Sequence, residues 1–234
     1  MNDTDFDSSL IAAAFRIAGR EGWMRVSVVA ACREAGLPLA RARTRFPSRG
    51  HILVRFGQMA DQHALTDAAA DGPIRDRLFD LLMRRFDALN AHRDGVKALM
   101  RALPFDPATA MLLACATGNS MRWMLQAAGV TATGPRGDLQ AKGLTAVWLW
   151  VLRTWEQDES EDLSQTMAAV DQALGRAEWF AGMLGATRSD EATAPSGDAG
   201  GIDTTDQPPP DFEAISEPPP DPDMPDESSD NSKP

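Results

Sequence analysis

The sequence contains no tyrosine, only two cysteines and only three histidines. Cys32 and Cys115 lie far apart and form no CxxC pattern or Cys/His ligand spacing, so we expect two small buried thiols in a reducing cytoplasm and no metal site. No Ser/His/Asp set, paired carboxylates or phosphate-binding glycine loop stands out. We therefore expect no cofactor and no enzymatic activity.

Long apolar runs are also missing. No stretch approaches the roughly 20 apolar residues that a helix needs to cross a bilayer. The first residues, MNDTDFDSS, are acidic and polar, unlike a signal peptide. We expect a cytoplasmic protein without stable membrane insertion.

Charge is distributed very unevenly along the chain. The net charge of −11 equals that of residues 187–234, which hold 13 acids and 2 bases. This segment is rich in proline and poor in large apolar residues, so we expect a disordered acidic tail. Residues 9–62 instead hold nine arginines and three acids. Such a basic segment on a slightly acidic body indicates an anionic partner such as nucleic acid.

The remaining pattern is helical throughout, because β-branched clusters are rare and apolar residues recur at spacings of three and four. We expect an all-α protein, with 107–129 apolar nearly all round and therefore central and buried. The predicted helices are 7–22, 27–34, 38–46, 48–71, 73–92, 94–103, 107–129, 138–157 and 163–184.

The first three helices have a helix-turn-helix layout, with the turn centred on Gly36. Such a motif places its second helix in the major groove of DNA. Arg41 and Arg45 are four residues apart and share one face of helix 38–46, whereas Arg43 points elsewhere. Arginine suits both guanine edges and phosphate oxygens, although a solvated basic face is the simpler alternative.

The stretch LIAAAFRIAGREGWMRVSVVAACREAGLPLARARTRFPSRGHIL resembles the TetR family of transcriptional regulators without gaps. Gly22-Trp23 matches the family's Gly-aromatic pair, Ser27 its phosphate-binding helix cap, Ala35-Gly36 its turn, and Phe46-Pro47-Ser48 with Arg49 the end of its motif. Pro38-Leu39-Ala40 stands where the family usually has Ser-Lys-Gly, and Arg43 and Arg45 replace Tyr and His.

This resemblance implies a homodimeric repressor that binds double-stranded operator DNA and is released by a small apolar effector. It implies a helix-turn-helix domain over 8–54 and, over 55–186, an effector-binding and dimerisation domain of about six helices, followed by the tail. The expected DNA contacts are Ser27, Arg41, Arg43, Thr44, Arg45 and Arg49.

Two further residue sets follow from the apolar pattern. Methionine adapts to irregular apolar ligands, so one set lines an effector pocket or belongs to the core: Met59, Phe79, Met83, Phe86, Met100, Met111, Cys115, Trp123 and Met124. The last two helices carry more apolar side chains than one chain is expected to bury. This indicates that they pair with the same helices of a second chain in a four-helix dimer interface. That interface set is Trp148, Val151, Trp155, Met167, Val170, Leu174 and Phe180.

A second resemblance leaves another function open. Residues 74–107 and 143–176, especially ALPFDP and TWEQDESEDLSQT, are similar to the accessory proteins of ubiquinone biosynthesis. Those proteins share the TetR-like fold but bind lipid or isoprenoid instead of DNA. Their function would depend on the pocket and on an amphipathic helix facing a membrane, not on the arginines.

Overall fold

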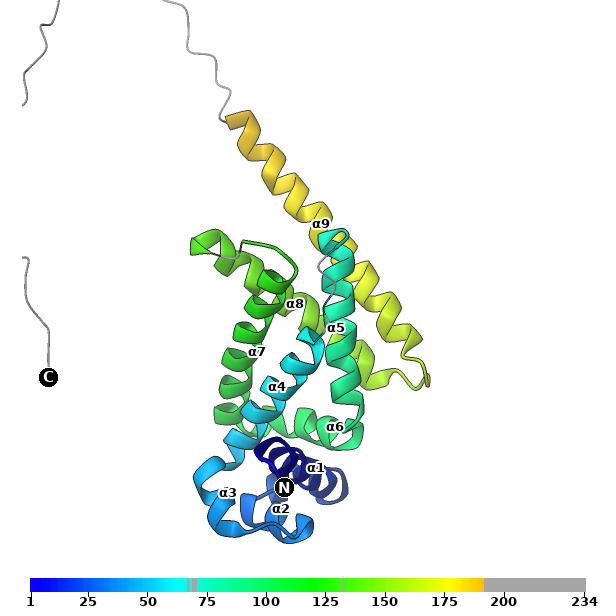
Figure 1. Cartoon of the computed structure of the whole chain (residues 1–234). Helices are drawn as coiled ribbons and strands as arrows, with labels where there is room; N and C mark the ends of the chain where they lie inside the picture. Colours follow the sequence, from blue (N-terminus) through cyan, green and yellow to red (C-terminus); the bar gives the residue numbers. More distant parts are fainter. Residues whose placement is uncertain (67, 69–70, 132, 192–234) are drawn as a thin grey trace, which may run out of the picture. The chain divides into compact units, whose positions relative to one another are not determined.

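The computed structural model describes residues 1–66, 68, 71–131 and 133–191. All regular structure in this part of the chain is helical (Figure 1), which confirms the all-α prediction. Most of the predicted acidic tail lies outside the described residues. The helices are α1 (Asp3–Glu21), α2 (Val28–Ala35), α3 (Leu39–Arg45), α4 (Arg49–Leu65), α5 (Ile74–Asn90), α6 (Arg93–Ala102), α7 (Pro107–Ala127), α8 (Gly134–Gln157) and α9 (Ser164–Glu191), with 3₁₀ turns at Trp23–Arg25 and Leu103–Phe105.

The first helix begins at Asp3, earlier than predicted. The Asn2 side chain caps it by accepting a hydrogen bond from the Asp5 backbone N–H at 2.7 Å, and carboxylates in a first turn suit the helix dipole. The helix ends at Gly22, whose φ of +89° is the kind of backbone that glycine adopts without strain. The acidic N-terminus is therefore part of the folded module.

Helices α1, α2 and α3 lie together at one end of this unit, and α4 leads from α3 along α7 (Figure 1). Helix α1 is held against α6 by a close backbone approach. A Cβ added at Gly95 of α6 would lie only 2.4 Å from the carbonyl oxygen of Phe15. The three-helix module is thus seated directly on the helical body, which sets where α3 stands.

The body is organised around aromatic contacts between α5 and α8. Phe86 stacks on Trp148 with ring centroids 4.3 Å apart, and Trp155 lies 6.3 Å away. Helix α9 packs against both α8 and α5. Its start is fixed by the buried Asp158 carboxylate, which accepts hydrogen bonds from the Thr166 backbone N–H and hydroxyl at 2.8 and 2.7 Å.

Three local predictions were wrong. Helix α7 is not buried all round, because Met111 and Trp123 are exposed; α4, α5 and α8 cover only part of its circumference. Cys115, on the same helix, is exposed as well, whereas Cys32 is buried as expected. Helix α8 also starts at Gly134, inside the segment 130–137 predicted as a loop, because Pro135 suits a first helical turn.

No helix in the described residues is both long enough and apolar enough to span a membrane.

Candidate nucleic-acid interface

The turn between α2 and α3 is built by local chemistry. The Ser27 side chain caps α2 by accepting a hydrogen bond from the Ala30 backbone N–H at 3.1 Å. Gly36 closes α2 in the left-handed conformation with φ of +65°, and Pro38 precedes the first turn of α3. These residues produce the helix-turn-helix geometry that the sequence predicts.

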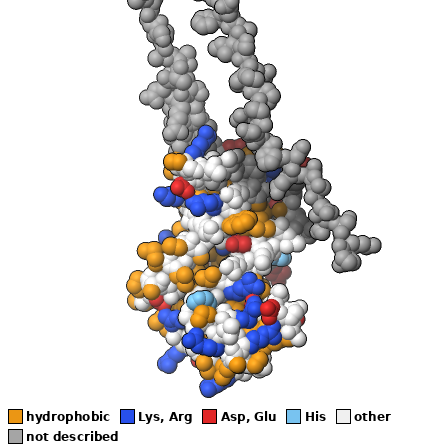
Figure 2. All heavy atoms as spheres, turned by 60° about the vertical axis from the view of Figure 1, so that its left-hand side comes forward, with side chains coloured by type: hydrophobic (Ala, Val, Ile, Leu, Met, Phe, Trp, Pro, Cys, Tyr) orange, Lys and Arg blue, Asp and Glu red, His pale blue; other side chains and the backbone are white. Residues whose placement is uncertain are grey.

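The outer face of α3 carries Leu39, Ala40, Arg43 and Thr44, which are all exposed. Arg43 reaches only the Pro47 carbonyl oxygen, at 3.4 Å, and has no acidic partner among the described residues. Arg25 and Arg33, exposed on the neighbouring segments, have no acidic partner in this described part either. Figure 2 shows Lys and Arg side chains interspersed with apolar ones at the lower end of the molecule in that view.

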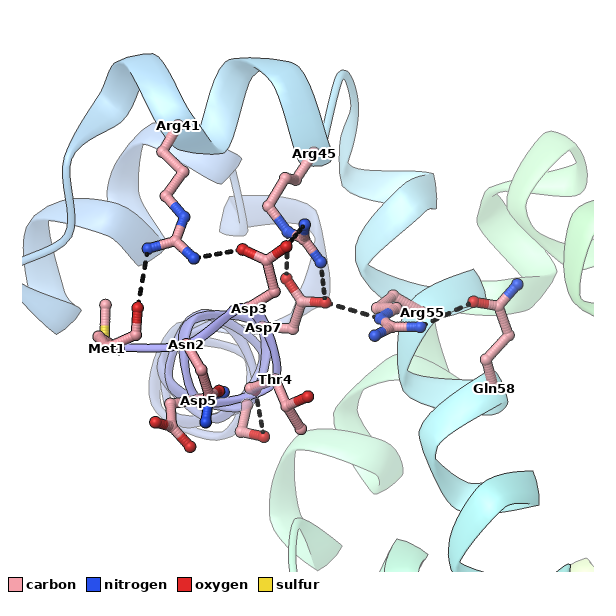
Figure 3. A network of polar contacts seen from close by, with 11 residues as sticks. Met1, Asn2, Asp3, Thr4, Asp5, Asp7, Arg41, Arg45, Arg55 and Gln58 are labelled. Atoms are coloured by element: carbon pink, nitrogen blue, oxygen red, sulfur yellow. Dashed lines mark hydrogen bonds and ion pairs between the residues drawn. The ribbon is translucent and has the colours of Figure 1, made fainter.

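Arg41 and Arg45 occupy the opposite side of α3 and turn toward the N-terminus of α1 (Figure 3). Arg41 donates hydrogen bonds to the Met1 carbonyl oxygen and to the Asp3 carboxylate. Arg45 binds Asp7 through two hydrogen bonds of 2.7 Å and lies 2.8 Å from Asp3. The two arginines share a face, as the spacing predicts, but that face meets α1.

Asp7 is the centre of this network. Its side chain is only 1% exposed, and it also accepts a hydrogen bond at 2.7 Å from Arg55 of α4. Burial raises the pKa of the Asp7 carboxyl, but the hydrogen bonds from Arg45 and Arg55 outweigh it and hold this pKa below its usual value. One carboxylate therefore ties α1, α3 and α4 together.

Arg49 lies at the start of α4 and is ion-paired with the body. Its Nη2 stands 2.6 Å from the Asp106 carboxylate, which also caps α7 through Thr109. Hydrogen bonds from the Thr109 side chain and backbone, with the charge of Arg49, lower the Asp106 pKa. The predicted DNA contact Arg49 is thus ion-paired between the three-helix module and α7.

Sequence reasoning missed Asp3 and Asp7 because it set the acidic first residues apart from the basic segment. A signal was present, since Asn2 is a good cap and Phe6, Leu10 and Ala14 continue the apolar stripe of α1 toward the N-terminus. The acidic residues 1–8 lower the net positive charge of the module. Three of its arginines have no carboxylate partner among the described residues: Arg25, Arg33 and Arg43.

The predicted effector set does not line a single cavity. The described residues enclose a cavity of about 830 Å³ between α5, α7, α8 and α9, and another of about 230 Å³ between α4, α5, α6, α7 and α8. Of the predicted set, Met100 alone lines either cavity. Phe86 and Met124 are buried in the core, Met59, Phe79 and Met83 are partly buried against it, and Met111, Cys115 and Trp123 are exposed.

Most of the predicted interface residues are buried within the single chain. The contact of α8 with α9 and α5 buries Trp148, Val151, Trp155, Val170 and Leu174. Met167 is half-buried, and the side chain of Phe180 lies outside the described residues. The exposed apolar side chains of α8 and α9 are instead Leu139, Leu149, Trp150 and Trp179.

No protein-family model matches the chain, and no curated protein matches it by sequence. Solved structures do match. A TetR transcriptional regulator from Nitrosomonas europaea superposes with a TM-score of 0.61 at 20% identity, covering 75% of this chain and 99% of that one. A TetR-family regulator from Streptomyces coelicolor superposes with a TM-score of 0.55 at 21% identity, covering 83% of this chain and 92% of that one.

A third match, a TetR transcriptional regulator from Rhodococcus sp. RHA1, has a TM-score of 0.51 at 16% identity and covers 74% of this chain and 96% of that one. These identities are low, so the likeness establishes the fold. The described chain has the fold of TetR transcriptional regulators, with a three-helix module that carries a helix-turn-helix seated on a helical body.

Proposed function

We propose that this chain is a DNA-binding transcriptional regulator, a repressor that binds a pseudo-palindromic operator as a homodimer. The observation that carries the proposal is the outer face of α3. Arg43 and Thr44 are exposed there, on the second helix of a helix-turn-helix, and Arg43 has no carboxylate partner among the described residues. Such a cation is available to a phosphate without breaking an internal ion pair.

Arg41 and Arg45 differ in the free energy needed to break their ion pairs with α1. Arg41 is paired with Asp3, whose side chain is 64% exposed, and exposed pairs contribute only about 0–1 kcal/mol. A good base contact discriminates by about 1–3 kcal/mol, so Arg41 can exchange Asp3 for a base edge. Arg45 is bound to the buried Asp7, and in our proposal it chiefly supports α3.

We place the remaining predicted contacts on the DNA backbone and on the edge of the groove. Ser27, as an exposed helix cap, and Arg43 contact phosphates, and Thr44 faces the groove. Arg49 contacts phosphate if it leaves Asp106, so it links DNA binding to the position of α7.

The effector site is assigned to the smaller cavity. Its wall includes Leu53, Phe56 and Gly57 of α4, the helix that follows α3 directly. A ligand shifts an equilibrium only by binding one conformation better than another. A molecule in contact with α4 has the means to do so, because any movement of α4 alters the position of the DNA-binding module.

The test is fluorescence anisotropy with the full chain and a labelled duplex from the region flanking its own gene, compared with a random duplex. We expect tighter binding to the flanking duplex at moderate salt. Arg43→Ala should weaken binding to every duplex and reduce the salt slope by about one unit. The control Arg153→Ala, an exposed arginine on α8, should change neither quantity. Equal affinity for both duplexes would exclude the regulator function.

A second candidate is the lipid-binding accessory function, favoured by one observation. Phe105, within the ALPFDP motif, is 83% exposed, and Met111 and Trp123 of α7 are exposed as well. Native mass spectrometry of protein purified from its own host distinguishes the two. A co-purified isoprenoid together with no preference between the duplexes would favour lipid binding.

A further inference from the structure

The smaller cavity contains a buried cation in a largely apolar wall, whose other polar side chains are those of Thr117 and Thr145. Arg85 of α5 is only 5% exposed and lines the cavity. The rest of the wall is dominated by side chains such as Phe56, Leu89, Val96 and Leu152. Burial lowers the pKa of Arg85 to about 10, so the guanidinium stays charged at neutral pH. A cation in such a place requires partners.

The charge of Arg85 is balanced, but its hydrogen bonds are incomplete. Its Nη1 forms an ion pair with Asp61, whose other carboxylate oxygen accepts a hydrogen bond from the Ser120 hydroxyl at 2.6 Å. The guanidinium carbon lies 5.0 Å from the Trp148 ring centroid. The buried Nε–H of Arg85 has no acceptor among the described residues, and an unsatisfied buried donor costs free energy.

We infer that this cavity binds a small, uncharged molecule with an apolar body and one carbonyl group that accepts a hydrogen bond from Arg85. The inference rests on the proposed function, because it names the class of its effector. The carbonyl supplies the missing acceptor. A carboxylate is disfavoured, because the Arg85–Asp61 pair is already neutral and a further buried anion has no counter-charge.

Size limits the ligand as well. The cavity measures about 230 Å³, below the ~300–1,000 Å³ typical of sites for drug-sized ligands. Ala114 and Leu149 at its wall are exposed, whereas Leu53 and Arg85 are buried. The cavity therefore extends inward from the surface between α7 and α8, which gives a compact ligand a path of entry.

The experiment compares three probes of similar shape on the full chain without DNA: acetophenone, cumene and benzoate. Tryptophan fluorescence reports binding, because Trp148 lines the cavity. We expect acetophenone to bind about tenfold more tightly than cumene, as one hydrogen bond to a charged donor provides, and benzoate to bind most weakly. Equal affinities, no binding, or tightest binding of benzoate would overturn the inference.

Two variants locate the effect. Gly57→Leu fills the cavity while leaving Arg85 and Asp61 intact, and a Cβ at Gly57 meets nothing within 4 Å; it should abolish binding of all three probes. Gly118→Leu, also with open space at its Cβ but outside the cavity, is the control and should bind as the wild type does.

The double variant Arg85→Met/Asp61→Asn removes the donor without leaving a buried charge. It should retain cumene binding and lose the preference for acetophenone; a retained preference would contradict the role of Arg85. These binding measurements are made without DNA. Their failure would overturn the ligand inference alone, whereas the anisotropy experiment tests the regulator function independently.

Discussion

At the scale of single residues, Asp7 decides what the basic segment can do. Counted along the sequence, the arginines of residues 9–62 form one positively charged group. In the structure, Arg45 and Arg55 are bound to Asp7, and Arg41 to Asp3 (Figure 3). The surface available to an anion is therefore smaller than the sequence count suggests, because only Arg25, Arg33 and Arg43 of these arginines lack a carboxylate partner among the described residues.

We predict that Asp7→Asn lowers the free energy of unfolding by about 2–3 kcal/mol, because it leaves two partly buried guanidinium groups without their carboxylate. Asp3→Asn is the matched control and should cost much less than Asp7→Asn, since Asp3 is exposed and solvent screens its ion pairs. Urea denaturation followed by circular dichroism measures both. Equal losses would contradict a central role for Asp7.

The contribution of Asp7 to the free energy of unfolding should depend on pH with a defined sign. Since the Asp7 pKa is lowered in the folded state, its contribution is complete above the ordinary carboxyl value of 3.8 and disappears as pH falls through the folded pKa. The wild type should therefore lose more stability than Asp7→Asn as the pH falls below 3.8 toward the lower folded pKa. Parallel curves for the two proteins would exclude this linkage.

At the scale of elements, the crossing of α1 and α6 sets the position of the three-helix module. Glycine is required there by space, because the Phe15 backbone occupies the place of a Gly95 side chain. The sequence shows Gly95 only as an ordinary helix residue, and helix propensity alone would favour alanine. A single close contact thus overrides local preference.

We predict that Gly95→Ala destabilises the protein by about 2 kcal/mol, since the added methyl group forces the two helices apart. Gly118→Ala, at a helical site with open space, should instead stabilise by up to about 1 kcal/mol. The midpoints of chemical denaturation test the pair. A neutral Gly95→Ala would show that the crossing adapts at little cost.

At the scale of the whole molecule, the proposed homodimer needs a surface that the single chain leaves open. Val170, fully buried against the chain's own helices, reports on folding and not on association when it is substituted. Trp150 is 42% exposed on α8 and lies near Arg176 of α9. It is the better probe of a contact made by these two helices.

We predict that Trp150→Glu weakens self-association at least about tenfold, because a charge in an apolar interface loses its hydration. Phe105→Glu, at an exposed apolar site on the Leu103–Phe105 turn that packs against α6 and α7, is the control and should associate as the wild type does. Sedimentation velocity at micromolar concentration measures both. A monomeric wild type would refute the homodimer and the palindromic operator with it.

The sequence by itself determined the helical architecture and the helix-turn-helix, because apolar spacing, caps and glycine stops act within a few residues. Ser27 and Gly36 are found in the local roles predicted for them. The bounds of α1 and α8 were less well predicted, since Asn2 and Pro135 are weaker signals than a long apolar stripe.

Tertiary structure alone decided which arginines meet carboxylates, where cavities lie and which apolar residues stay exposed. The partners of Arg45 and Arg49 are separated from them by 38 and 57 positions, and no local pattern encodes such pairings. The same holds for Arg85, whose neighbours Asp61 and Trp148 come from different helices. These contacts depend on helix crossings, which arise from packing across the whole chain and not from the residues next to each site.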